Sequence, residues 1–281
     1  MNKIIKAITK IGYKLLITAA PPKCIVCGRL LRNDGTLCER CLKIFAKNER
    51  KRCPVCQKQA KNCTCRPMSL METDSLGGRI MIALAFLSSP DSIDVTDRLI
   101  RKMVYHIKRN EDRTGVTFAA RIISHEIYRT LNESGYDKNS FILTSPPRSN
   151  SETLKYGFDH AKELAMKISE YTGIPYVKCF VRKSDKMQKT LNAHERRANA
   201  DRTYELKGLS NMQIQNVFLV DDVITTGATL NACARLLKRS GVSIVFPICF
   251  ARTKKRLPKG RKPLNRTPWF NSKKMKIKYN L

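Results

Sequence analysis

The stretch that decides the fold is Val217-Phe-Leu-Val-Asp-Asp-Val-Ile-Thr-Thr-Gly-Ala-Thr229. Its first four residues, Val217–Val220, are all apolar, which predicts a parallel strand buried on both faces. Asp221 and Asp222 follow at the carboxyl end of that strand, the edge where open α/β sheets bind their ligands. The pattern therefore predicts an acidic pair at the ligand-binding edge of a parallel sheet.

The second half of this stretch predicts a tight turn that opens a helix. The helix is expected over Ala228–Arg239, and Gly241 is expected to end it. Gly227 lets backbone amides approach a phosphate, the threonine hydroxyls add donors, and the helix N-terminus adds a partial positive charge. The residues predicted to hold the phosphate are Thr225, Thr226, Gly227, Ala228 and Thr229.

All thirteen positions resemble the signature of the type I phosphoribosyltransferases: four hydrophobic residues, two acids, two hydrophobic residues and Thr-Thr-Gly-x-Thr. The resemblance implies an α/β fold with a mainly parallel sheet flanked by helices, and phosphoribosyl diphosphate (PRPP) as ligand. It also implies that Asp221 and Asp222 contact the ribose hydroxyls as the catalytic acids, and that the Thr-Gly turn holds the 5′-phosphate. Mg²⁺ is expected with the diphosphate, because a hard cation prefers phosphate oxygens.

Cysteine spacing is the second strong pattern, because eight of the eleven cysteines precede residue 66. A two-residue gap lets both sulfur atoms of a turn face one metal ion, and two such turns complete a tetrahedral zinc site. Disulfides are the alternative, but they suit exported mini-proteins, and the N-terminus carries no predicted export signal. The predicted ligands are Cys24, Cys27, Cys38, Cys41, Cys53, Cys56, Cys63 and Cys65.

These spacings predict one or two zinc ions and leave the pairing of the ligands open. Sequential filling would join the first four cysteines in one site and the last four in another. A crossed arrangement, or one filled site beside an empty one, fits the spacing as well. Four protein ligands leave no position for water, so the metal is expected to fold this small stretch rather than to catalyse.

Further segments resemble the ComF group of competence-associated proteins, which join an N-terminal double zinc ribbon to a phosphoribosyltransferase domain. The resemblance covers about residues 22–250 and implies a role linked to competence and DNA uptake. It rests on the cysteine array, on Leu99–Ile107 followed by Lys108, on Phe141–Arg148, on Tyr156–Ala161, and on Arg182, Gln188, Arg196 and Asn199.

The chain departs from the ComF pattern beside the expected diphosphate. Tyr156 stands where the group has an arginine, and Asp159-His160 replaces Asn-Gln. Losing a cation there weakens the stabilisation of a leaving diphosphate. Arg148 or Lys155 is the candidate replacement, and the sequence does not predict whether the chain turns PRPP over.

A polar segment, residues 182–202, allows two interpretations. It is either a solvated amphipathic helix or a mobile lid that closes over the diphosphate and excludes water. In the second interpretation Arg182, Gln188 and Arg196 contact PRPP, together with Arg148.

Charge is the last strong feature, with a formal net charge of +31. Residues 1–65 carry 15 basic and 3 acidic side chains, and residues 252–281 carry 12 basic and no acidic ones. Such flanks predict a polyanion partner, with single-stranded DNA or another nucleic acid as the candidate. In the tail, Trp269, Phe270 and Tyr279 either stack on bases or pack on the domain.

The predicted organisation is an amphipathic helix over residues 1–19, a double zinc ribbon over 20–67, a phosphoribosyltransferase domain over 75–251 and a basic tail over 252–281. The sequence predicts no membrane span and a cytoplasmic location. The first functional hypothesis is a PRPP-binding phosphoribosyltransferase of unknown acceptor. The second is a non-catalytic nucleic-acid-binding protein that uses PRPP as a cofactor or signal. The sequence does not predict the oligomeric state.

Overall fold

The computed structural model describes residues 22–32, 35–49, 81–87, 94–109, 113–149, 153–155, 157–183, 203–207, 214–225 and 227–253. Several predictions of the sequence fall outside these residues. They are the helix over 1–19, the cysteines Cys53, Cys56, Cys63 and Cys65, Tyr156, Gln188, Arg196, Thr226 and the tail beyond residue 253.

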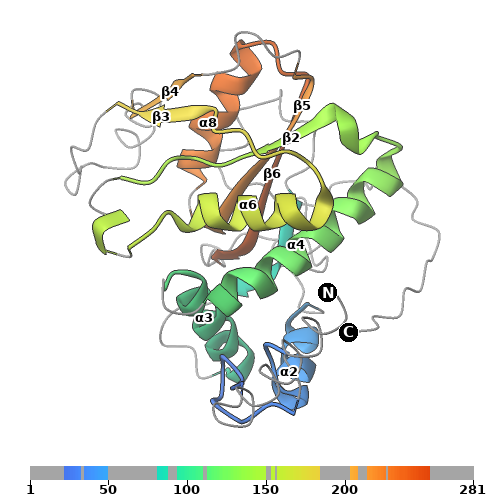
Figure 1. The fold of residues 1–281 in the computed structure, drawn as a ribbon, viewed down its shortest axis with the longest axis vertical. Coiled ribbons are helices and arrows are strands. Elements are labelled where there is room, and N and C mark those ends of the chain that lie inside the picture. The colour runs from blue at the N-terminus through green and yellow to red at the C-terminus, as the bar shows by residue number, and fades with distance from the viewer. Residues whose placement is uncertain are drawn as a thin grey trace, which may run out of the picture.

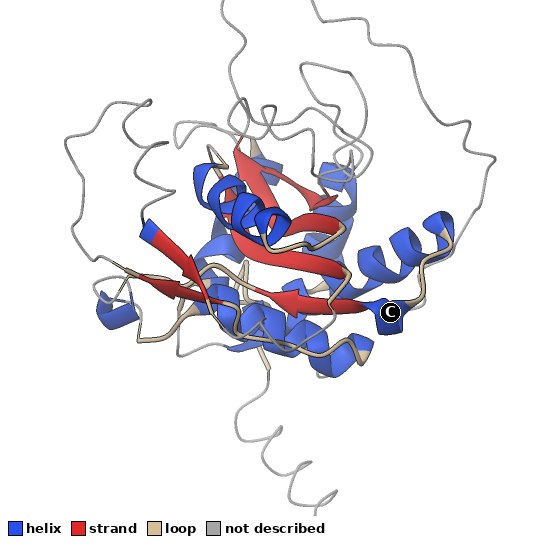
Figure 2. Ribbon diagram, turned by 90° about the horizontal axis from the view of Figure 1, so that it is seen from above, coloured by secondary structure: helices blue, strands red, loops and turns tan. Residues whose placement is uncertain are grey.

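Among the described residues, the central element is a four-stranded sheet in the order β1-β6-β5-β2. The strands are β1 (Met81–Leu87), β6 (Ile244–Thr253), β5 (Asn216–Ile224) and β2 (Phe141–Thr144). All three pairings between them are parallel. Figure 2 shows the sheet with helices on both sides, which confirms the predicted type I phosphoribosyltransferase fold.

The strand of the acidic pair is longer than predicted, because β5 stays paired with β6 as far as Ile224. Its other neighbour is shorter: β2 pairs with β5 only from Asn216 to Leu219. Asp221 and Asp222 therefore lie within a strand, just beyond the point where the neighbouring strand β2 ends. This step opens the sheet edge at the acids and leaves room for the loop that follows β2.

Helices cover the two faces of the sheet (Figure 1). α3 (Val95–Ile107), α4 (Arg113–Ser134) and α6 (His160–Thr172) lie on one face, and α8 (Ala228–Arg239) lies on the other. The bounds of α8 are those that the sequence predicts. None of the described helices combines the length and the apolar character that a membrane crossing requires.

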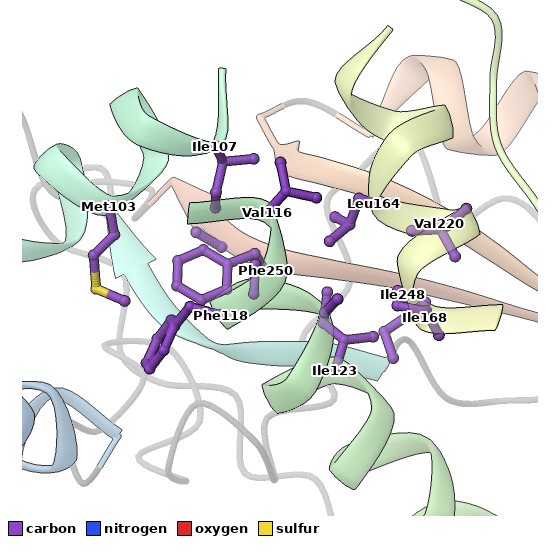
Figure 3. Close-up of a cluster of buried hydrophobic side chains, with 14 of the residues drawn as sticks. Met103, Ile107, Val116, Phe118, Ile123, Leu164, Ile168, Val220, Ile248 and Phe250 are labelled. Carbon is purple, nitrogen blue, oxygen red and sulfur yellow. The ribbon is translucent and has the colours of Figure 1, made fainter. Parts of the chain in front are cut away.

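Alternating residues of β5 divide the hydrophobic core into two parts. Phe218 and Val220 pack with α3, α4 and α6, whereas Val217 and Leu219 pack with α8. This is the period-2 alternation of a strand that is buried on both faces. Figure 3 shows the first part, where side chains of the three helices meet the sheet; it labels Ile107, Val116, Leu164, Ile168, Val220, Ile248 and Phe250 among others.

Two helices begin at aspartates that satisfy their free backbone amides. The Asp94 carboxylate accepts a 2.8 Å bond from the Thr96 amide at the start of α3. The Asp159 carboxylate accepts a 3.1 Å bond from the Lys162 amide at the start of α6. Such caps contribute about 1 kcal/mol each. They also fix where each helix begins, and hence where Lys108 and His160 lie.

The cysteine-rich segment shares the hydrophobic core of the domain. Its helix α2 (Glu39–Glu49) places Phe45 edge-on to Phe118 at 5.5 Å and stacked on Phe250 at 6.3 Å. The Lys102 ammonium of α3 also donates a 2.9 Å hydrogen bond to the Val26 carbonyl. The described part of the zinc-ribbon segment is thus packed firmly against α3 and the sheet.

A short antiparallel ribbon stands apart from the main sheet. It consists of β3 (Phe180–Arg182) and β4 (Tyr204–Leu206). The two strands flank residues 184–202, so the described ends of the predicted lid are paired with each other. A 3-10 turn, η3 (Lys138–Ser140), leads into β2.

Replacing Phe45 by Ala tests this shared core. Phe45 is 2% exposed and contacts two aromatic rings of the domain, so its truncation is expected to lower the free energy of unfolding by about 3–5 kcal/mol. Chemical denaturation measures the loss. Leu154→Ala, at a residue 84% exposed, serves as the control and should change stability by under about 0.5 kcal/mol. A similar small loss for Phe45→Ala would mean that the segment does not pack on the domain.

Candidate functional site

The acidic pair lies at the carboxyl end of the sheet, where β2 has ended and β5 continues. The Asp222 side chain is only 2% exposed, and that of Asp221 is 13% exposed. The Asp221 carboxylate accepts a 2.8 Å bond from the Asp222 amide, and the Asp222 carboxylate accepts one from the Val223 amide. Two neighbouring carboxylates in so buried a position require nearby positive charge.

Arg148 supplies the first cation and bridges both acids. Its Nη2 lies 2.6 Å from Oδ1 of Asp222 and 3.2 Å from Oδ1 of Asp221. Arg148 belongs to the loop after β2, and its amide points to the Asp159 carboxylate at 3.4 Å. The structure therefore brings together three residues that the sequence assigned to the site, and it shows Arg148 engaged with the acids.

Lys108 supplies the second cation, a contact that the sequence did not predict. It caps the C-terminus of α3, and its Nζ lies 3.3 Å from Oδ2 of Asp222. His160, in the first turn of α6, is 1% exposed and close enough to Asp222 and Lys108 to interact with their charges. Burial and the positive charge of Arg148 lower the pKa of His160, so its imidazole is neutral at physiological pH.

The pKa values of the two carboxyl groups are shifted in opposite directions. Burial alone would raise the pKa of Asp222, but Arg148 and Lys108 outweigh it and hold that pKa well below its ordinary value. Burial and the adjacent Asp222 charge raise the pKa of Asp221, although Arg148 opposes them. Asp222 is thus the firmly ionised member of the pair, and Asp221 is the member that exchanges a proton more readily.

The predicted phosphate turn leads directly into α8. Gly227 adopts φ 79° and ψ 6°, a left-handed conformation that glycine adopts without strain, and its carbonyl accepts the first helical bond from the Asn231 amide. The amides of Ala228 and Thr229 therefore lie at the helix N-terminus, where an anion is favoured. Thr225 is exposed beside them, and Thr226 lies outside the described residues.

Arg182 lies at the base of the predicted lid and contacts Tyr204 across the β3–β4 ribbon. The guanidinium carbon is 5.7 Å from the ring centre of Tyr204. Burial raises the pKa of Tyr204, while Arg182 and a hydrogen bond with Thr229 act in the opposite direction. Tyr204 thus joins Arg182 to Thr229 of the predicted phosphate turn, a link that the sequence did not predict.

Two of the residues at which the chain departs from the ComF pattern, Asp159 and His160, are described in the structure. Asp159 caps α6, as the asparagine of the group would, because both residue types accept amide bonds at a helix start. Lys155 is exposed, whereas Arg148 is bound to the acids. Of these two candidate cations, Arg148 is therefore the one that contacts the acidic pair. Tyr156 lies outside the described residues.

A second site is formed by four cysteines. The sulfur atoms of Cys24, Cys27, Cys38 and Cys41 all lie within 4.8 Å of one another, and those of Cys27 and Cys38 are 3.6 Å apart. A tetrahedral zinc ion with bonds of about 2.3 Å would separate its sulfur ligands by about 3.8 Å. The four thiols fit one zinc ion, and for these four the grouping is the sequential one.

The residues that sequence reasoning missed share one property: they act on the site from other elements. Lys108, His160 and Tyr204 are brought to the acids or the phosphate turn by α3, α6 and β4. Lys108 ended a segment that the ComF resemblance had singled out, so a signal existed for it. His160 also lies in such a segment, Tyr156–Ala161, although the sequence gives it no metal-ligand or triad spacing. Tyr204 carries no such signal, because single aromatic residues are found at many buried positions.

The comparisons with known proteins agree with one another. Residues 154–273 match the family described as phosphoribosyl transferase domain. Competence protein ComFC of Streptococcus pneumoniae is 23% identical over 243 residues, which are 82% of this chain and 100% of the relative. Competence protein ComFC of Bacillus subtilis is 26% identical over 75% of this chain and 82% of the relative.

A further relative has a different name. The DNA utilization protein YhgH of Escherichia coli O157:H7 is 24% identical over 82% of this chain and 90% of its own length. The similarity to all three relatives extends over most of each chain, so it includes more than the phosphate turn.

The cysteine cluster leads to a prediction about metal content. Cys41→Ser is expected to lower the zinc content by one ion per chain, because it removes one of four ligands that lie together. Elemental analysis of the purified proteins measures this. Cys179→Ala changes a buried cysteine outside the cluster and should leave the zinc content unaltered. Equal zinc in all three proteins would show that the cluster does not bind the metal.

Proposed function

The chain belongs to the ComF family, and from that membership and the geometry of the acidic pair we propose that its phosphoribosyltransferase domain binds PRPP. The observation that carries the proposal is the buried, cation-balanced pair Asp221–Asp222, which precedes the Gly227 turn at the start of α8 by five residues in the sequence. The carboxylates offer acceptors for ribose hydroxyls, and the helix N-terminus offers donors for the 5′-phosphate.

In this proposal the diphosphate lies on the side of Arg148, and Arg182 approaches from the β3–β4 ribbon. Gln188 and Arg196 remain candidates for closing over it. Bound PRPP would carry Mg²⁺ on its phosphate oxygens, where the ion balances the charge of the leaving diphosphate. In the ligand-free structure Arg148 and Lys108 balance the two carboxylates.

The chemistry open to such a site is transfer of the phosphoribosyl group. A nitrogen or oxygen nucleophile would bond to the anomeric carbon, and the bond from that carbon to the diphosphate oxygen would break, leaving its electron pair on diphosphate. Cations held in place before the reaction stabilise that departing charge. No described residue identifies the acceptor, so the proposal names the donor and not the acceptor. We place this protein in competence or DNA utilization because relatives are named competence protein ComFC and DNA utilization protein YhgH.

Isothermal calorimetry with PRPP and Mg²⁺ tests the ribose site. The parent is expected to bind PRPP at least about tenfold more tightly than diphosphate alone, since the ribose adds hydrogen bonds to the acids. The double variant Asp221→Asn/Asp222→Asn should lose that preference. Asp137→Asn, the same change at the cap of η3, is the matched control and should retain it. A folded parent that binds neither ligand would contradict the proposal.

A second candidate function, non-catalytic binding of single-stranded nucleic acid, is favoured by the outer face of α3. Arg98, Lys102, Tyr105 and Arg109 are exposed at helical spacing, with the Arg109 guanidinium 4.3 Å from the Tyr105 ring centre. The single carboxylate of this helix, Asp97, is buried. Such a stripe offers cations to a phosphate backbone and a flat ring to a base.

Fluorescence anisotropy with a labelled oligothymidine at several salt concentrations tests the second candidate. The double variant Arg98→Gln/Arg109→Gln is expected to bind more weakly and to reduce the salt slope by about 1.4, since each cation on a single strand contributes about 0.7. Lys178→Gln/Arg239→Gln removes the same charge from exposed positions elsewhere and should have a smaller effect. Equal effects of both pairs would mean that total charge, and not the α3 face, governs binding.

A further inference from the structure

Lys108 contacts the site in a way that the proposed function leaves unexplained. Its Nζ lies 3.3 Å from Oδ2 of Asp222, whereas Arg148 contacts Oδ1 of the same carboxylate and also reaches Asp221. The two cations therefore have different positions. Arg148 stands across the pair on the loop after β2, and Lys108 holds only the more buried acid from the end of α3.

Ligand binding makes this difference important. Ribose hydroxyls need carboxylate oxygens as acceptors, and in the ligand-free structure Arg148 occupies an oxygen of each acid. A diphosphate attracts the same guanidinium, because planar bidentate donors suit phosphate oxygens. When Arg148 turns toward the diphosphate, Lys108 is the cation among the described residues that still contacts Asp222. A buried carboxylate without a nearby cation tends to take up a proton.

We propose that Lys108 is a positioning residue that keeps Asp222 ionised and fixed while Arg148 moves from the acidic pair to the diphosphate. The inference rests on the proposed binding of PRPP at this site. In this inference the two cations have different roles. Arg148 contacts the acids without ligand and the diphosphate with it, whereas Lys108 contacts Asp222 in both states. Asp222 then accepts a hydrogen bond from a ribose hydroxyl, and its carboxylate stays ionised whether or not Arg148 contacts it.

The packing of α3 against α4 explains how Lys108 is held. Gly115, in the first turn of α4, lies so close to the last turn of α3 that a methyl group on it would be 2.8 Å from the His106 carbonyl carbon and 2.9 Å from the Ile107 nitrogen. Lys108 follows these two residues directly. A side chain at position 115 must therefore displace the backbone just before Lys108, so Gly115 permits the packing that places Lys108 beside Asp222.

Among the described residues, the titratable groups that face Asp222 come from several elements. Asp221 is its neighbour in β5, Arg148 lies in the loop after β2, Lys108 ends α3, and His160 begins α6. His160 is neutral because burial and Arg148 lower its pKa. With Arg148 drawn to a ligand, Lys108 is the cation among these groups that remains to lower the pKa of Asp222.

Lys108→Met tests the inference, since it keeps the length of the side chain and removes the charge. Without the ammonium the pKa of Asp222 rises, so PRPP binding should weaken further relative to the parent as the pH falls. The ratio of variant to parent Kd is expected to grow by on the order of tenfold between about pH 8 and about pH 6. Lys108→Arg should restore the parent profile. Lys47→Met, at an exposed lysine of α2, should follow the parent.

Gly115→Ala should reproduce the effect of Lys108→Met through the backbone, with the same growth of the Kd ratio at low pH. Gly135→Ala is the matched control, because Gly135 has φ 69° and no atom within 4 Å of an added Cβ. That substitution strains the protein at a place remote from the acids, so it lowers stability and leaves the pH profile of binding unchanged. If both alanine variants changed binding alike, general destabilisation would explain the effect and the role of Gly115 would be overturned.

A ligand-free measurement separates this inference from the proposed function. Carboxyl ¹³C NMR follows Asp222 during a pH titration of the parent and of Lys108→Met. An upward shift of the Asp222 pKa in the variant, together with the altered binding profile, supports the inference. An unchanged Asp222 titration overturns it even when PRPP binds. A parent that binds no PRPP overturns the proposed function, and the titration still shows whether Lys108 controls Asp222.

Discussion

Two adjacent carboxylates buried in one strand are unstable unless cations balance them, and this requirement connects the parts of the structure. Asp221 and Asp222 draw Arg148 from the loop after β2 and Lys108 from the end of α3. Removing one partner of such a buried pair is strongly unfavourable, because it leaves an uncompensated charge away from water. The acids therefore determine the positions of two segments that are remote from them in the sequence.

α3 lies at the centre of this arrangement. The middle of the helix contacts the cysteine-rich segment, because the Lys102 ammonium donates a hydrogen bond to the Val26 carbonyl. In the sequence Val26 lies between Cys24 and Cys27, two of the clustered cysteines. The C-terminal end of α3 carries Lys108 to Asp222, and the close approach of Gly115 holds that end in place. The zinc-ribbon segment and the acidic pair thus contact the same helix at different places. Phe45 adds a second connection by packing into the core of the domain.

Much of this fold could be predicted from local sequence patterns. The apolar run before Asp221 predicted the buried parallel strand, and the glycine-containing turn predicted α8 with its correct bounds. These features depend on residues close together in the chain. The spacing of the cysteines likewise predicted a cluster, and for Cys24, Cys27, Cys38 and Cys41 the structure selects one of the arrangements that the spacing had left open.

The rest depended on contacts between distant segments. The sequence suggested Arg148 as a ligand of the diphosphate, but not that it lies on the acids when no ligand is bound. The length of β5 beyond β2 was not predicted, because strand ends are set by pairing partners and not by the apolar run alone. Lys108 and His160 reach the site through the packing of α3 and α6, and no local pattern encodes that packing.

The central claim is that Asp221 and Asp222 form the ribose site and that Arg148 is shared between these acids and the ligand. A crystal structure of the protein with PRPP and Mg²⁺ tests it most directly. The account predicts ribose hydroxyls on the two carboxylates, Arg148 turned onto the diphosphate and Lys108 still within contact distance of Asp222. PRPP bound away from the acids, or bound with Arg148 still bridging them, would contradict the account.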